Sequence, residues 1–337
     1  MAEIVLGMWT SHGPTLSTTP QQWLMRVKAD QNRPSHPFRL QNYSFEELKE
    51  LRKPENLGEQ ASLEQRTIRH GRCQDAISKM ADIWDEVKPD VAIIMGNDQK
   101  EIFNEDMIPA FTVFSGETLF NEPASAEQIP LMAPGIHEAE DGHNPSEYTE
   151  YPGHPELGRL IIEQATKDGF DVAQMTKLPK HEKHWSSGVG HAFGYIYRQM
   201  MRDNVVPNVP IIANTFFPPN QPTAKRCFEF GRMVGRAIRN WDSDLKVAII
   251  GSGGMSHFVI DEDLDQLFMK ALESRDADVL TNLDEGYFQT GTSELKNWIS
   301  AAGVLFDTSL HGEMIDYVPC YRSEAGTGTA NGFVYWR

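Results

Sequence analysis

The sequence predicts an α/β fold in which one central mixed sheet is flanked by helices. Short apolar runs rich in β-branched residues, at 91–95, 209–213 and 247–250, are typical of buried strands. Helical patterns alternate with them, and a long one spans 63–87. Polar residues or glycines follow the strands directly. Because ligands of open α/β sheets bind at the carboxyl ends of the strands, we expect the active site at that edge of the sheet.

The chain has 337 residues, and we interpret residues 1–337 as a single domain, because α/β folds often reach this size around one core. Two segments depart from the pattern. Residues 17–60 are polar and carry prolines between short helical stretches, which predicts a helical excursion. Residues 116–155 are acidic and rich in proline and glycine without a clear period, which predicts a long loop, either a lid or a solvated excursion. We expect the histidines of this loop to be exposed, namely His137, His143 and His154.

The composition excludes several classes of function. A net charge of −17 argues against a nucleic-acid or anionic-membrane partner, because no segment gathers enough lysine and arginine to overcome that field. The three cysteines are far apart, so we expect them to be reduced. The sequence shows no basic leader and no apolar run of membrane-spanning length, and we therefore expect a cytoplasmic protein.

Polar side chains follow three of the predicted strands. The first strand is followed by His12, the strand at 91–95 by the polar run 97–99, and the strand that ends in glycines 251–254 by His257. A single histidine at such a place usually only bonds a nearby carbonyl. Three such strand ends at one edge of the sheet favour a ligand site.

Two further residues of the same chemical kind lie at predicted helix starts. His191 precedes a helical pattern at 192–202, and Glu294 lies in the first turn of a pattern at 290–302. An acidic residue in a first turn complements the helix dipole, which by itself explains most such glutamates. Two histidines with one carboxylate, however, are also the triad that holds Fe(II) in non-haem oxygen enzymes, where further histidines can act as acid and base.

The order of several motifs along the chain carries more information than their spacing. The motifs are Ser11-His12-x-Pro14, Lys88-Pro89-Asp90-Val91, Gly96-Asn97-Asp98, Ile108-Pro109, Pro222 to Gly231, Gly251 to His257, and Ser293-Glu294 with Trp298-Ile299. The chain thereby resembles the class III extradiol ring-cleavage dioxygenases, the family of the protocatechuate 4,5-dioxygenase β-subunit and of gallate and 3-O-methylgallate dioxygenases. The resemblance covers nearly all of the sequence except 17–60 and 116–155.

The resemblance implies a non-haem Fe(II) centre and assigns residues to it. The first iron-ligand histidine of the family falls on His12, and the carboxylate ligand falls on Glu294. His257 falls on the catalytic histidine. Another active-site histidine of the family best matches His191, with His184 as the alternative.

The chain departs from the family at the second iron-ligand histidine, where it has Gln99. A neutral amide oxygen is a weaker ligand than imidazole, so the affinity for Fe(II) should fall unless a neighbour completes the shell. Gln99 itself binds the metal, or Asp98, Glu101 or another histidine replaces it, or the site has lost its metal. Because the other four positions are present, we expect a working site with His12, Gln99 and Glu294 as ligands.

The activity implied by the resemblance is insertion of O2 beside the diol of a catechol-type aromatic acid, such as gallate, 3-O-methylgallate or protocatechuate. His257 would exchange protons with the substrate hydroxyl, as suits a side chain that titrates near neutral pH. His191 would hydrogen-bond the developing oxyanion. We expect five residues to line the substrate pocket, namely Trp9, Thr10, Trp185, Ser252 and Gly253.

Two other classes of function compete with this one. The first is a non-catalytic homologue or partner subunit that binds an aromatic acid through a weakened metal site, which Gln99 favours. The second is another metal-assisted reaction such as hydrolysis, because fold does not fix chemistry. For the assembly we expect a homodimer or a complex with a separate small subunit.

Overall fold

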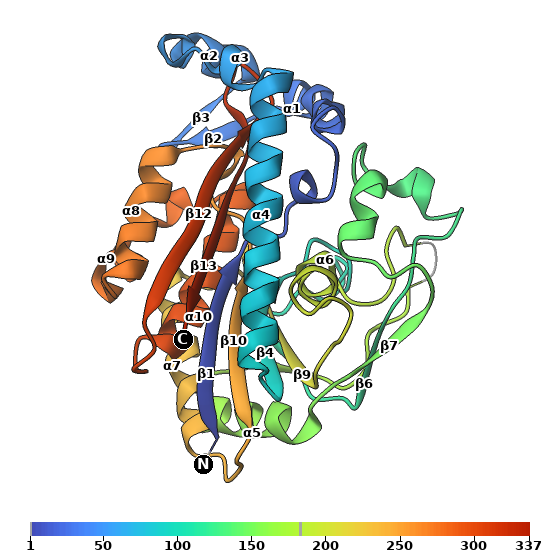
Figure 1. The fold of residues 1–337 in the computed structure, drawn as a ribbon, viewed down its shortest axis with the longest axis vertical. Helices are drawn as coiled ribbons and strands as arrows, with labels where there is room; N and C mark the ends of the chain where they lie inside the picture. Colours follow the sequence, from blue (N-terminus) through green and yellow to red (C-terminus); the bar gives the residue numbers. More distant parts are fainter. Residues whose placement is uncertain (1, 182–183) are drawn as a thin grey trace.

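The computed structural model describes residues 2–181 and 184–337, and within them the predicted α/β fold is confirmed (Figure 1). A nine-stranded mixed sheet has the strand order β11-β13-β1-β10-β4-β9-β5-β8, and β12 pairs with β13. Its strands are β1 (Glu3–Thr10), β4 (Val91–Asn97), β5 (Phe111–Phe114), β8 (Ala173–Met175), β9 (Asn208–Ala213), β10 (Lys246–Ser252), β11 (His257–Val259), β12 (Gly312–Tyr321) and β13 (Thr327–Trp336).

The middle of the sheet is parallel, which brings several strand ends to one edge. β10 pairs in parallel with β1 and with β4, and β4 pairs in parallel with β9. The register sets Thr10 opposite Ser252, and Asn97 opposite Ala213. The loops that follow β1, β4 and β10 therefore leave the sheet side by side, as expected for a ligand site at the carboxyl ends of strands.

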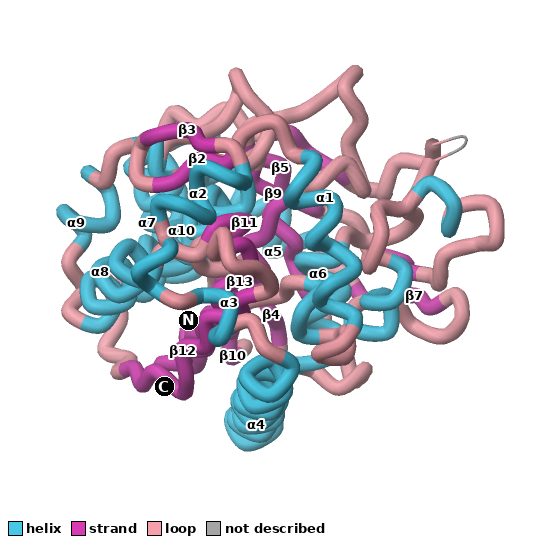
Figure 2. The backbone as a smooth tube through the Cα atoms, turned by 90° about the horizontal axis from the view of Figure 1, so that it is seen from above, coloured by secondary structure: helices cyan, strands magenta, loops and turns pink. Residues whose placement is uncertain are grey.

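Alternate residues of the central strands face two separate layers of helices, as the two-residue period of a strand requires. On one face, Val91, Ile93 and Met95 pack with α5 (Pro155–Lys167), α7 (Ala224–Arg239) and α10 (Leu295–Leu305). On the other face, Ala92 and Ile94 pack with α4 (Leu63–Val87) and α6 (His191–Tyr195). Figure 2 shows α4 on the opposite side of the sheet from α7 and α10. The remaining helices are α1 (Val27–Asn32), α2 (Phe45–Leu51), α3 (Leu57–Gln60), α8 (Glu262–Glu273) and α9 (Ala277–Asn282).

The two segments outside the regular pattern are more ordered than expected. Residues 17–60 contain α1, α2 and α3, but also a small antiparallel sheet of β2 (His36–Phe38) and β3 (Gln41–Tyr43). Residues 116–155 were expected to form an irregular loop, but this expectation is wrong near both ends of the segment. There β6 (Thr118–Asn121) pairs with β7 (Thr149–Pro152), so the backbone groups of both strands are satisfied by each other.

The C-terminal residues extend the sheet. β12 and β13 form a long antiparallel pair, and β13 also pairs with β1 and with β11. In this way β13 sets His257 opposite Thr329. In the described part of the chain, no helix has the length and apolar character that crossing a membrane requires.

Candidate active site

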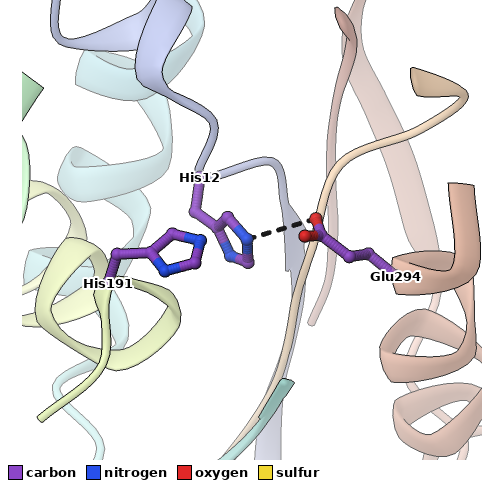
Figure 3. A group of neighbouring side chains, drawn as sticks. All are labelled: His12, His191 and Glu294. Carbon is purple, nitrogen blue, oxygen red and sulfur yellow. Dashed lines mark ion pairs between the residues drawn. The ribbon is translucent and has the colours of Figure 1, made fainter. Parts of the chain in front are cut away.

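A cavity of about 370 Å³ opens at the carboxyl ends of the central strands. Its wall includes His12 after β1, His191 at the start of α6, His257 at the start of β11, and Glu294 just before α10. Figure 3 shows His12 between His191 and Glu294, with the three side chains arriving from three different elements. One ligand atom from each of these three residues lies within 4.8 Å of the others.

The hydrogen bonds of Ser252 fix which nitrogen of His12 faces the cavity. The Ser252 hydroxyl donates its proton to the carbonyl of Ala192 at 2.6 Å, so its oxygen accepts from Nδ1 of His12 at 2.8 Å. Nε2 of His12 is then the unprotonated nitrogen. It lies 3.2 Å from a carboxylate oxygen of Glu294 and forms no hydrogen bond among the described residues. Burial lowers the pKa of His12, which favours this neutral form.

Glu294 is buried and held by donors on both of its oxygens. Oε1 accepts the side-chain amides of Gln99 at 3.1 Å and Asn97 at 3.3 Å. Oε2 accepts the backbone N–H of Gly254 at 2.7 Å. These contacts satisfy a buried carboxylate that would otherwise be costly, and they orient it toward His12.

His191 forms an ion pair with Glu101 on the cavity wall. Nδ1 of His191 lies 2.7 Å from a Glu101 oxygen, which also accepts the backbone N–H of His191 at 2.9 Å. Burial opposes charge on both groups, but their mutual attraction raises the pKa of His191 to about 9 and lowers the pKa of Glu101 to about 2. Because Nδ1 is committed to Glu101, Nε2 is the nitrogen left for the cavity.

His257 also has its Nδ1 committed, and its ring is closely enclosed. Nδ1 donates to the carbonyl of Met255 at 2.7 Å, so Nε2 is the nitrogen left for the cavity, and it lies 3.6 Å from Glu294 Oε2. A Cβ built on Gly254 would lie 2.6 Å from the ring, and a Cβ on Gly291 would overlap the ring. Only glycine at these two positions leaves room for the imidazole.

Gln99 lines the same cavity and contacts Glu294 of this cluster. Its amide nitrogen donates to Glu294, so in this orientation it offers a donor and not a lone pair. Among histidine, cysteine and acidic side chains, the structure groups His12, His191 and Glu294, and the predicted set of His12, Gln99 and Glu294 stays a prediction. Asp98, one predicted replacement, accepts four backbone N–H groups of its own loop, from residues 100–103.

Most of the chain matches one protein-family model. Residues 59–306 match the family model described as the catalytic LigB subunit of aromatic ring-opening dioxygenase. The chain belongs to the LigB family. The match covers β4, α6, β11 and α10, which hold Gln99, His191, His257 and Glu294 or lie next to them, whereas His12 precedes it.

Two individual proteins are similar to this LigB-family chain. Gallate dioxygenase of Pseudomonas putida is 32% identical over 124 residues, which are 36% of this chain and 34% of that protein. The matched part thus spans about a third of the relative's length. The crystal structure of an uncharacterized protein from Escherichia coli K12 aligns with a TM-score of 0.43 and 13% identity, covering 77% of this chain and 91% of the other.

The residues predicted to bind substrate are only partly on the cavity wall. Trp185 lines the cavity of this LigB-family chain. Trp9, Thr10, Ser252 and Gly253 are buried and are not on its wall, so their contact with a substrate stays a prediction. The Trp9 indole points into the core and donates to the carbonyl of Trp298, while Ser252 supports His12 from behind.

The structure separates the two candidate histidines and places a third, His143, where the sequence did not predict it. His184 bonds the backbone of Ser186, whereas His191 reaches the cluster. His143, expected to be exposed, is half-buried on the cavity wall, with its ring 6.1 Å from that of His191. Burial, reinforced by the positive charge of His191, lowers the pKa of His143 to about 4. The sequence around His143 has no periodicity that would have indicated this position.

Proposed function

We propose that this chain is a non-haem Fe(II)-dependent extradiol dioxygenase, which inserts both atoms of O2 into a catechol-type aromatic acid beside its diol and opens the ring. The observation that carries the proposal is the convergence of His12, His191 and Glu294 on one cavity of a LigB-family chain. The similarity to gallate dioxygenase supports gallate, 3-O-methylgallate or protocatechuate as the substrate class.

The donor set fits a divalent iron ion. Two imidazoles and one carboxylate are the ligands of the facial triad in non-haem Fe(II) oxygenases. Nε2 of His12 is buried without a hydrogen-bond partner among the described residues, which is costly unless another group contacts it. His12, His191 and Glu294 would hold the ion, which would have to displace the proton on Nε2 of His191. Bound Fe(II) would supply Lewis acidity toward the diol oxygens and a route for electrons from the ring to O2.

Glu101 and Ser252 are the outer supports of this set. Metal-binding histidines usually donate their second ring N–H to a carboxylate or another oxygen, which fixes the ring and increases its basicity. Glu101 does this for His191 and Ser252 does it for His12. The side-chain amides of Gln99 and Asn97 donate hydrogen bonds to Glu294 and orient its carboxylate. In this scheme Gln99 is therefore a positioning residue.

His257 is the proton carrier in the proposed reaction. Its Nε2 is left for the cavity, since Nδ1 donates to Met255, and in the neutral ring this nitrogen carries the lone pair. It would accept the proton of one substrate hydroxyl and return it to an oxygen of the ring-opened product. An imidazole can both accept and release a proton, which suits transfer in both directions.

The cavity is suited to a flat aromatic molecule. Its volume of about 370 Å³ falls within the range of small-molecule sites. Trp23, Trp185, Phe258 and Ile136 supply apolar and aromatic surface on its wall. Such surface would stack against a ring and keep water from the reacting diol.

The experiment that tests the proposal is O2 consumption by anaerobically purified, Fe(II)-reconstituted protein. The panel is gallate, 3-O-methylgallate, protocatechuate, catechol and 2-aminophenol. We expect uptake of one O2 per molecule of a carboxylated diol, together with loss of its aromatic absorbance. His12→Ala and Glu294→Ala should abolish uptake with loss of iron, whereas an exposed histidine substitution, His137→Ala, serves as the control.

Two results would contradict the proposal. Tight iron binding without O2 uptake from any compound would point to another metal-assisted reaction. An absence of both iron binding and uptake, with an aromatic acid still bound, would favour a non-catalytic binding subunit.

A further inference from the structure

Three arginine side chains gather around one carboxylate beside the cavity. Arg322 forms a two-pronged ion pair with Asp30, with nitrogen–oxygen distances of 2.6 and 2.8 Å, and both side chains are buried. Arg26 and Arg33 lie close enough to this pair to interact with it electrostatically. The guanidinium of Arg33 stacks over the ring of Phe258 at 4.1 Å. Three positive charges therefore face one negative charge, in a protein whose net charge is −17.

Of these three arginines, Arg322 is paired with Asp30, and Arg26 is the one without an ion pair to a described residue that also lines the cavity. Its one described hydrogen bond is a long contact of 3.4 Å to the carbonyl of Pro134, and it forms no ion pair with any described residue. Burial, followed by repulsion from Arg322, lowers the pKa of Arg26 to about 10, so it remains charged at neutral pH. A half-buried guanidinium without a counter-ion is stabilised when an anion reaches it.

The other cations on the cavity wall are already paired. Lys100 lies 2.7 Å from Glu105, Arg322 pairs with Asp30, and His191 pairs with Glu101. Among the described lysines and arginines of the wall, Arg26 alone has no carboxylate partner. An anionic ligand in the cavity would therefore form its ion pair with Arg26.

The strand register places the Arg322–Asp30 pair close to the reacting centre. Thr329 of β13 lies opposite His257, and Thr327, two residues earlier, lies opposite Val259. The Thr327 hydroxyl donates to Asp30 at 2.8 Å, which ties the arginine group to that point of the strand. Two residues of a strand span roughly 7 Å. Arg26 and His257 line the same cavity, so a benzoate whose hydroxyls face His257 can turn its carboxylate toward Arg26.

We propose that Arg26, backed by Arg322, binds the carboxylate of the aromatic substrate and so makes the cavity selective for acids over neutral catechols. This inference rests on the proposed function, since it orients a diol toward His12 and His257. Arg26 acts in binding and orientation, because its charge lies at the end of the ring remote from the bonds that change.

The test compares matched pairs of ligands that differ only in the carboxylate. Protocatechuate is compared with catechol, and gallate with pyrogallol, by calorimetric binding without O2 and by kcat/KM for O2 uptake. For Arg26→Gln we expect binding and kcat/KM for the acids to fall about tenfold to a hundredfold, the range of a charge-assisted hydrogen bond. The neutral partners should change only a few-fold, and Arg26→Lys should restore part of the affinity.

Arg159→Gln is the matched control. It removes the same charge from an exposed position on α5, outside the cavity, and should leave both ligand pairs as in the wild type. Thermal unfolding of each variant shows whether it folds, and Arg26→Met serves as a second variant if Arg26→Gln does not.

The outcomes separate this inference from the proposed function. If Arg26→Gln loses affinity equally for acids and neutral diols, the role of Arg26 is overturned while ring opening stays in place. The same holds if the wild type binds catechol with the same affinity as protocatechuate. Wild-type protein that opens no ring but binds the acids through Arg26 would overturn the proposed activity and keep the subsite. Absence of acid binding by the wild type would overturn the subsite.

Discussion

The carboxylate of Glu101 lies 2.7 Å from Nδ1 of His191 and accepts the backbone N–H of the same residue at 2.9 Å. A single side chain therefore fixes both the imidazole and the first residue of α6. Glu101 is itself buried, so the pair is screened from solvent. The position of Nε2 of His191, opposite His12 and Glu294, depends on this contact.

Replacing Glu101 by glutamine should weaken metal binding. Glutamine is close in size and can still accept one hydrogen bond, but it lacks the charge that holds and polarises the ring of His191. Loss of such an outer partner typically costs tenfold to a hundredfold in metal affinity, and we expect that range here. Equilibrium dialysis against Fe(II) or Co(II) measures it. Glu163→Gln, an exposed change on α5, is the control, and equal affinities for the two variants would contradict the role of Glu101.

Substitutions at Gln99 and His191 distinguish the two possible third ligands. If His191 holds the metal, His191→Ala should lose most of the bound metal. Gln99→Ala should retain about one ion per chain, with a smaller loss of affinity from the missing hydrogen bond to Glu294. Metal content after gel filtration gives the answer directly. The reverse order of losses would identify Gln99 as the ligand and His191 as a residue that acts on oxygen.

The sequence predicted the parts of this molecule that local pattern determines. The buried strands β4, β9 and β10 and the helix α4 follow from periodicity. The place of His12 and His257 after strands follows from the rule that ligands bind at strand ends. Side-chain direction was harder to predict. Trp9 and Thr10 end a strand whose flanking layers both bury them, so a position near the site did not mean a position on the pocket wall.

Contacts made by irregular segments could not be predicted from the sequence. His143 reaches the cavity because β6 and β7 anchor the segment between them against the domain. The pairing of Arg322 with Asp30 joins residues separated by 292 positions. The link between Glu101 and His191 spans 90 positions. No periodicity or motif in the local sequence indicates these contacts. Each of them depends on how irregular segments pack against the folded sheet.

Gly291 should be needed for activity through the space that it leaves for His257. A Cβ at position 291 would overlap the imidazole, and the ring has little freedom because Gly254 closes its other side. Gly291→Ala should therefore displace His257 and lower kcat for ring opening by a hundredfold or more, as expected when a proton carrier leaves its position. Bound metal should remain, since none of the three grouped donors is touched.

The control for Gly291→Ala is Gly71→Ala. A Cβ at Gly71 would meet no atom within 4 Å, and alanine favours the helix α4 in which it lies. Measurements of kcat, metal content and circular dichroism on both variants check the prediction. Unchanged turnover in Gly291→Ala would show that His257 does not need its present position.

The buried carboxyl of Asp265 should make the fold more stable in mild acid than in base. It accepts the backbone N–H and the hydroxyl of Ser256, at 2.8 and 2.6 Å, and the hydroxyl of Tyr317 at 2.7 Å. Burial, with a smaller contribution from Asp261, raises the pKa of Asp265 to about 7 against the lowering effect of these hydrogen bonds. In the unfolded chain an aspartate has a pKa of about 3.9.

The sign of the effect follows from proton binding. Between pH 4 and pH 7 the folded chain holds a proton on Asp265 that the unfolded chain has released, so the free energy of unfolding falls as the pH rises through this window. The full loss is on the order of 4 kcal/mol and is complete above about pH 7. Asp265→Asn removes this ionisation, so its stability should fall much less between pH 5 and pH 8. Urea unfolding at the two pH values measures the difference, with the exposed Asp75→Asn as control. If Asp265→Asn and the wild type lose the same stability over this interval, Asp265 is ionised in the folded protein and its hydrogen bonds outweigh its burial.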